Sequence, residues 1–158
     1  MDIELIPPIN VEFEQRVRGP GAGLIQNKIL LATGPAPARL DRSKYGGAQF
    51  SEAIFATLGT TFFLQGNRGR TYVNGAAIEM GDNRRSGRIW LPGGLYFDVP
   101  ENAAAVYIGT LRYTRNAFND ITAVQVRNEY QDAVNLFRAK YGSHTVLTKS
   151  LLRKIDPR

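Results

Sequence analysis

The chain has 158 residues, 43% hydrophobic and 22% charged, values typical of one globular domain spanning residues 1–158. It contains no cysteine and one histidine, which excludes disulfides, thiolate metal sites and multi-histidine metal sites. The formal net charge is +6, but the lysines and arginines are dispersed, which favours a solvated surface over an anion-binding stripe.

The N-terminal third predicts two strands and a long loop. Apolar and charged residues alternate over residues 11–17, the pattern of a half-buried strand. Residues 24–33 predict a second strand, with a bend near Asn27. The stretch Gly34–Gly47 is rich in proline, glycine and basic residues. We interpret it as a long surface loop, and a binding loop or lid is the functional alternative.

Residues 50–64 carry two competing signals. The first half fits either a short helix capped by Ser51 or a strand, and the sequence leaves this open. The second half, residues 60–64, combines threonine, phenylalanine and leucine and predicts a strand.

Closely spaced turn signals follow. Asn74-Gly75 predicts a type I′ hairpin turn, and further turns are expected at Gly81–Asn83 and Pro92–Gly94. The segments around them predict strands at residues 70–73, 76–80, 88–91, 95–99, 103–113 and 121–126. Many short strands at this spacing indicate a mainly β fold, either a sandwich of transthyretin or immunoglobulin type or an open barrel.

Near the C-terminus the period changes from two to that of a helix. An apolar stripe at helical spacing predicts one amphipathic helix over residues 128–141, packed on the sheet. Its stripe consists of Tyr130, Ala133, Val134, Phe137 and Tyr141. Asn128 is the expected N-cap and Gly142 the expected left-handed stop. A short strand or docked tail is predicted over residues 145–152.

Catalytic chemistry has few candidates in this sequence. His144 is the lone histidine, and no serine stands in a nucleophile elbow. Asp98, Glu101 and Asp120 lie at strand ends or in loops, where acids usually serve turns. We therefore expect no catalytic residue, and an enzyme of unrecognised class is a minor alternative.

Cofactor and metal sites are not expected either. Residues 66–70 are glycine-rich and basic, but lack the phosphate-loop pattern and do not lead into a helix. Asp82-Asn83 has no further acid at calcium-ligand spacing.

Nucleic-acid binding is the second alternative function. Arg84, Arg85 and Arg88 lie near Trp90, and Arg112 and Arg115 lie near Tyr113. Aromatics beside arginines can stack bases and neutralise phosphates. Trp90, Tyr96 and Tyr107 are also the residue types that fill a β-core, and the core interpretation is favoured.

Residues 87–100, with their Pro-Gly hairpin signal and terminal Val-Pro step, resemble a recurring piece of uncharacterised lipoprotein-like β-sandwich domains of Gram-negative cell envelopes. Residues 106–111, the helix over 132–141 and the tail 149–152 carry the same likeness. The resemblance implies a β-sandwich in the periplasm or at the outer membrane, with a cytoplasmic location as the alternative. It transfers no site residue. Such proteins usually carry an export signal and a lipid-bearing cysteine, so a lipid anchor is expected only if the native N-terminus lies upstream of Met1.

These observations predict a noncatalytic envelope domain that binds a protein or glycan partner. The apolar runs are too short for a transmembrane helix. The expected binding surface is the loop Gly34–Gly47, since long loops on a rigid sheet often carry sites.

Overall fold

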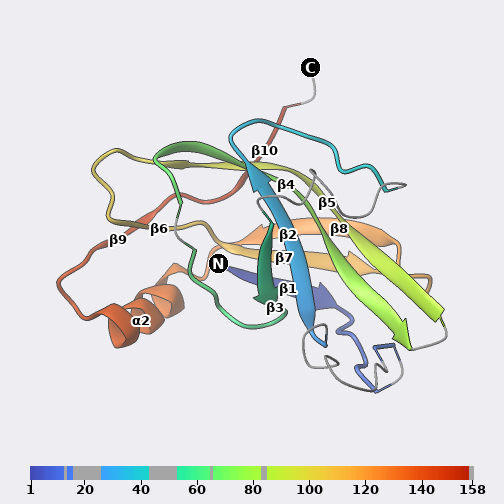
Figure 1. The fold of residues 1–158 in the computed structure, drawn as a ribbon. Coiled ribbons are helices and arrows are strands. Elements are labelled where there is room, and N and C mark those ends of the chain that lie inside the picture. The colour runs from blue at the N-terminus through green and yellow to red at the C-terminus, as the bar shows by residue number, and fades with distance from the viewer. Residues whose placement is uncertain (13, 16–25, 43–52, 65, 83–84, 157–158) are drawn as a thin grey trace.

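The computed structural model describes residues 1–12, 14–15, 26–42, 53–64, 66–82 and 85–156 (Figure 1). Its strands are β1 (Asp2–Ile6), β2 (Lys28–Gly34), β3 (Ile54–Thr57), β4 (Gly69–Asp82), β5 (Arg85–Val99), β6 (Ala105–Tyr107), β7 (Thr110–Arg115), β8 (Ile121–Arg127), β9 (Leu147–Lys149) and β10 (Arg153–Lys154). The helix α2 spans Tyr130–Tyr141.

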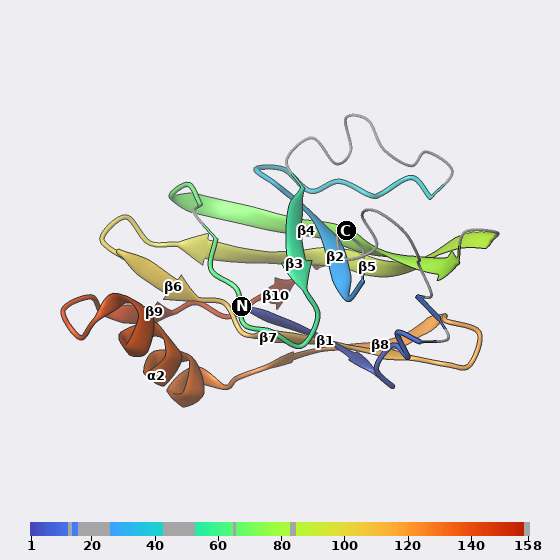
Figure 2. The same ribbon diagram turned by 60° about the horizontal axis from the view of Figure 1, so that its bottom comes forward.

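Two sheets face each other as layers (Figure 2). One has the strand order β10-β5-β4-β2-β3, and the other has the order β1-β7-β8. Their inner faces share one hydrophobic core that includes Ile3 of β1, Leu31 of β2, Ile89 of β5 and Leu111 of β7. Strands make up 49% of the structure and helix 9%, which confirms the predicted mainly β, sandwich-like fold with one helix near the C-terminus.

The prediction of turns at Asn74-Gly75 and Pro92–Gly94 is wrong. Both segments lie inside the long hairpin of β4 and β5, at a bulge where Gly75 pairs with Pro92 and the register shifts. Gly75 has φ +139°, a backbone conformation that favours glycine. The glycine signals therefore mark a close approach between two strands rather than a reversal. The reversal lies between Asp82 and Arg85, where a turn is also predicted, although residues 83–84 lie outside the described part.

Gly93 is the position in this bulge with least space. A Cβ on Gly93 would lie 2.1 Å from the carbonyl carbon of Asn74, a backbone atom that cannot rotate away. We expect Gly93→Ala to lower the free energy of unfolding by about 1–3 kcal/mol, as measured by urea denaturation. Gly87→Ala is the matched control, because a Cβ on Gly87 of the same strand meets nothing within 4 Å. Equal stability of the two variants would contradict this account of the bulge.

Several other strand predictions need correction. Residues 11–12 and 14–15 form turns, not the predicted strand over 11–17, and the rest of that segment lies outside the described residues. Gln15 is buried there, and its side-chain amide has hydrogen-bond partners. The amide donates to the carbonyl of Glu79 at 2.6 Å and accepts from the N–H of Asn27 at 2.8 Å. Residues 60–64 form no strand. The expected strand over 103–113 is interrupted at Gly109, which has φ +102°.

The open question over residues 50–64 is partly resolved. Ile54–Thr57 is strand β3, paired with β2, and Ser51 lies outside the described residues. Strands β2 and β8 match the predicted strands over 24–33 and 121–126 within the described residues, and Asn27 has the φ of +55° expected of a bend.

The helix matches its prediction except at its first turn. It begins at Tyr130 with Glu129 in the cap position and no side-chain cap, so the prediction of an Asn128 cap is wrong. The backbone N–H of Glu129 instead donates to the hydroxyl of Tyr107 at 2.7 Å. Gly142, with φ +83°, ends the helix and donates to the carbonyl of Arg138 at 2.8 Å, as expected.

Helix α2 covers a second, smaller cluster. Val134 and Phe137 are buried against Tyr107 and Leu147, which belong to the parallel pair β6 and β9. Strand β9 lies within the predicted C-terminal strand. Tyr141 is 50% exposed, so the apolar stripe is buried along only part of its predicted length. The reason is that Tyr141 stands at the edge of an open pocket, described next.

Candidate functional site

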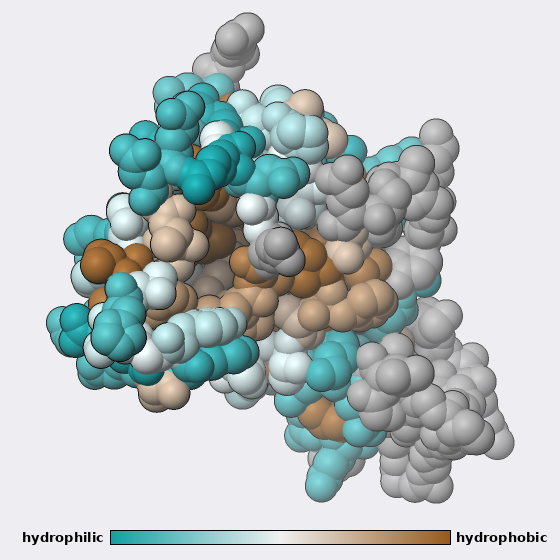
Figure 3. All heavy atoms as spheres, turned by 60° about the vertical axis from the view of Figure 1, so that its left-hand side comes forward, coloured by the Kyte–Doolittle hydropathy of each residue, from teal (hydrophilic) through white to brown (hydrophobic). Residues whose placement is uncertain are grey.

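An apolar pocket of about 520 Å³ opens at the end of the sandwich that is nearest α2. Figure 3 shows this face as a hollow surrounded by hydrophobic residues. Its walls come from distant parts of the chain: β2, β3, β4 and β5, residues 61–64 and Gly66, β6, α2, Thr145 and Leu147. The pocket therefore lies where the sandwich core meets the cluster under the helix.

The walls carry little charge: burial lowers the pKa of the α-amino group of Met1, a lining residue, to about 6, and this group donates to the carbonyl of Phe62 at 3.0 Å. Among the described residues that line the pocket, none has a charged side chain. The small polar side chains are four threonines: Thr33, Thr61, Thr71 and Thr145. The hydroxyl of Tyr107 is already engaged, since it accepts from the N–H of Glu129 at 2.7 Å and donates to the carbonyl of Arg127 at 3.4 Å. Such walls hold an apolar molecule and offer it few hydrogen bonds.

Aromatic rings form the wall beside α2. The ring of Phe63 lies 6.1 Å from that of Phe137 and meets the ring of Tyr141 edge-on at 5.3 Å between centroids. Phe137 and Tyr141 are 5.0 Å apart. The ammonium of Lys140 lies 4.6 Å from the centre of the Phe63 ring, at the outer side of this wall. Packed rings of this kind make a rigid, apolar surface.

The four candidate catalytic residues do not meet in the pocket. Its described lining contains neither His144 nor any of the three acids. Asp98 pairs with Arg70 at 2.9 Å and with Arg153, and the hydrogen bond from Arg70 holds the pKa of the Asp98 carboxyl below its ordinary value. His144 and Glu101 are exposed, and Asp120 accepts from the side chain of Asn116 at 3.2 Å.

The candidate base-stacking residues are divided between core and surface. Tyr113 is fully buried, and its hydroxyl donates to the carbonyl of Pro92 at 2.9 Å. Burial raises the pKa of this phenol. Arg112 pairs with Glu4 at 2.6 Å. Tyr113 therefore has no free face for a base. Trp90 is half-buried, while Arg84 and the side chain of Arg85 lie outside the described residues.

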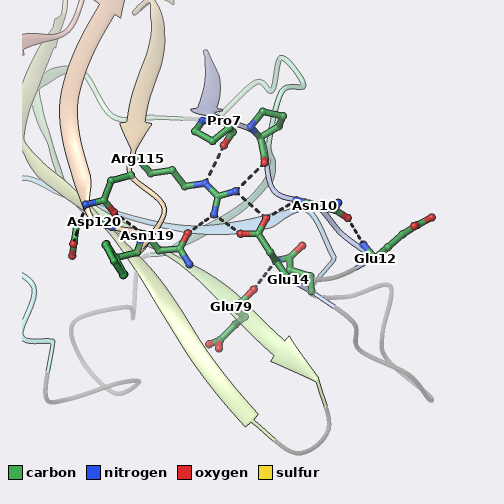
Figure 4. Close-up of polar contacts among 12 residues, drawn as sticks. Pro7, Asn10, Glu12, Glu14, Glu79, Arg115, Asn119 and Asp120 are labelled. Atoms are coloured by element: carbon green, nitrogen blue, oxygen red, sulfur yellow. Dashed lines mark hydrogen bonds and ion pairs between the residues drawn. The ribbon is translucent and has the colours of Figure 1, made fainter.

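Arg115 is a buried cation with a structural task (Figure 4). Its Nε donates to the carbonyl of Pro7 at 3.0 Å. One terminal nitrogen donates to Glu14 at 2.5 Å and to Asn119, and the other to the carbonyl of Pro8 and to Glu14, both at 2.9 Å. These contacts use all five N–H donors of the guanidinium, so none is left for a ligand.

Of the remaining predicted features, only Gly66 of the stretch 66–70 is among the described residues that line the pocket. No group of three metal-ligating side chains occurs within the described residues, and Asn83 lies outside them. Gly69 adopts φ +91°, as a backbone bend requires. In the loop Gly34–Gly47, residues 43–47 lie outside the described part, and residues 34–42 do not line the pocket. The N–H of Ala38 donates to the side chain of Asn74 at 2.9 Å, which ties this loop to β4.

Sequence reasoning missed the pocket because its walls come together only in the folded chain. One local signal was available. The apolar run Phe62-Phe63-Leu64 was interpreted as a strand, yet these residues line the pocket without strand pairing. In the described part of the chain, no helix has the length and apolar character needed to cross a membrane. Comparison with known protein families, with curated proteins and with solved structures finds no match to this chain.

Proposed function

We propose that this chain is a noncatalytic binding domain whose pocket holds a small apolar molecule or an alkyl chain. The observation that carries the proposal is the pocket itself, about 520 Å³ enclosed by apolar and aromatic side chains. Ligand sites in proteins typically measure about 300–1,000 Å³ and have mainly apolar walls with a few polar groups. The four threonine hydroxyls supply those polar groups here.

The chemistry of the walls restricts the ligand. A buried charge without a partner is costly, and no charged side chain among the described lining residues would pair with one. The part of the ligand inside the pocket is therefore neutral. Any charged group of the ligand stays at the opening, in contact with water.

A glycan partner has less support than an apolar ligand. Sugars commonly stack on an exposed aromatic face, and Tyr96 is the half-exposed candidate on the outer side of β5. Its ring is covered by the guanidinium groups of Arg70 and Arg153, whose central carbons lie 4.3 and 4.7 Å from the ring centre. The envelope location stays a prediction that rests on the resemblance of residues 87–100, 106–111, 132–141 and 149–152.

Blocking the opening tests the proposal. Ala104 lines the pocket and is exposed, so Ala104→Trp places a large ring at its opening without disturbing the core. We expect the wild type to bind the neutral fluorescent probe N-phenyl-1-naphthylamine, and Ala104→Trp to bind it at least about tenfold more weakly because the ring occupies part of the cavity. Fluorescence titration measures both dissociation constants.

Ala139→Trp is the matched control, since Ala139 is an exposed alanine of α2 that does not line the pocket. It should bind the probe as the wild type does. Absence of binding to the wild type, or equal binding by both tryptophan variants, would overturn the proposed function. Thermal unfolding of each variant confirms that the fold is intact.

A further inference from the structure

Exposed apolar side chains gather around the opening of the pocket. Leu64 and Tyr141 line it and are 38% and 50% exposed. Val146 stands between two lining residues, Thr145 and Leu147, and is 75% exposed. We call Leu64, Tyr141 and Val146 the rim residues. Single exposed apolar residues are ordinary, but a group around one concave site indicates an interaction surface.

A lysine that contacts aromatic rings, but has no ion pair within the described residues, lies beside this rim. The ammonium of Lys140 stands 4.6 Å from the ring centre of Phe63 and 5.4 Å from that of Tyr141, both residues of the pocket wall. It forms no ion pair with any carboxylate in the described part of the chain. Several arginines elsewhere do contact carboxylates within 4.0 Å, namely Arg70, Arg112, Arg115, Arg127 and Arg153. The charge at the opening is thus available to an outside anion.

The apolar rim and the ammonium of Lys140 together match the chemistry of an anionic lipid surface. Apolar side chains enter the boundary between headgroups and acyl chains, and a lysine extends its ammonium to the phosphates while its methylenes stay in the apolar layer. An acidic protein surface would pair with Lys140, but its charged groups would not match the apolar rim and pocket beside that lysine.

We propose that the opening of the pocket docks on an anionic lipid surface, with the rim residues in the interface and Lys140 at the headgroup phosphates. The proposal rests on the proposed function, because docking brings the neutral pocket directly over the acyl chains. The net charge of +6 favours approach to such a surface. Docking should weaken at high salt, which screens exposed charges.

Vesicle sedimentation tests the docking. We expect the wild type to sediment with vesicles of phosphatidylcholine and phosphatidylglycerol in equal parts, and far less with phosphatidylcholine alone. Lys140→Gln and Val146→Ser should each weaken partitioning about fivefold, and the double variant about 25-fold if the two contributions add. Phe118→Ser is the matched control, because Phe118 is 86% exposed in the turn between β7 and β8 and does not line the pocket.

The naphthylamine titration separates this proposal from the proposed function. Neither Lys140 nor Val146 lines the pocket, so both variants should keep wild-type affinity for the probe. Probe binding without vesicle binding would overturn the docking alone. Equal binding to both kinds of vesicle would overturn the role of Lys140, and wild-type partitioning of the double variant would overturn the docking surface. Loss of both probe and vesicle binding by the wild type would overturn both proposals.

Discussion

Replacing Arg115 with methionine is expected to lower the free energy of unfolding by about 1–3 kcal/mol, because it removes a buried guanidinium that uses all its N–H donors, although its partner Glu14 is 28% exposed. The side chain of Arg115 is 6% exposed, and its guanidinium holds the carboxylate of Glu14 and the carbonyls of Pro7 and Pro8. Without it these acceptors lose their donors. The contacts also join the end of β1 to the β7–β8 hairpin, more than 100 residues later in the chain.

Arg112→Met is the matched control for this prediction. Arg112 lies on the same strand and also pairs with a glutamate, Glu4, at 2.6 Å, but their side chains are 30% and 25% exposed. Ion pairs that water reaches usually contribute less than about 1 kcal/mol. Urea unfolding of the two variants should therefore give clearly different stabilities, and equal losses would show that burial of Arg115 adds nothing.

The loss at Arg115 should depend on pH through Glu14. The hydrogen bond from Arg115 holds the pKa of the Glu14 carboxyl below its ordinary value of 4.5. A carboxyl whose pKa is lowered by folding adds stability above its unfolded pKa, and this stability is lost as the pH falls through the folded value. The stability gap between wild type and Arg115→Met should thus be full near neutral pH and narrow below pH 4.5.

Asp2 acts in the opposite direction but does not disturb this comparison. Burial raises the pKa of its carboxyl, so protonation on acidification relieves a cost of folding. This contribution is the same in wild type and variant and cancels in their difference. A gap that stays constant down to about pH 3 would contradict the role of Glu14.

The sequence predicted the features of this fold that depend on neighbouring residues, above all the helix α2. The stripe through Val134 and Phe137 and the stop at Gly142 are set by residues within one helix, and the helix appears within two residues of its predicted limits. The two false turns share one cause. Asn74-Gly75 and Pro92–Gly94 have the composition of turns, but they face each other across a bulge, where glycine is needed to let two backbones approach. A single sequence gives no sign that the two segments are partners.

Long-range pairing explains the other omissions. Strand β1 is five residues long and pairs in parallel with β7, with Ile3 opposite Leu111. Its partner is more than 100 residues away, so no local sequence pattern predicts it. The pocket is hidden for the same reason, since Thr33, Phe63, Phe97 and Phe137 become neighbours of one cavity only after the sheets have formed. The composition indicates that the chain can form a hydrophobic core, but it does not indicate where that core leaves a pocket.

Phe137→Ala is expected to lower the stability of the α2 region by about 3–5 kcal/mol, the usual cost of truncating a buried phenylalanine. Phe137 is 5% exposed and packs against the rings of Phe63 and Tyr141. It belongs to the cluster under the helix, which is distinct from the core between the sheets. We therefore expect hydrogen exchange to accelerate in α2 and β9, while the amides of β4 and β5 stay protected.

Leu136→Ala separates this packing effect from a simple change in the helix. Leu136 precedes Phe137 but is 50% exposed, so its truncation removes little buried surface and should cost less than about 1 kcal/mol. A loss below about 1 kcal/mol for Phe137→Ala as well would show that the helix is peripheral. Because Phe137 also lines the pocket, its variant should change the affinity for the naphthylamine probe, whereas Leu136→Ala should not. The same ring thus links the anchoring of the helix to the shape of the cavity that it closes.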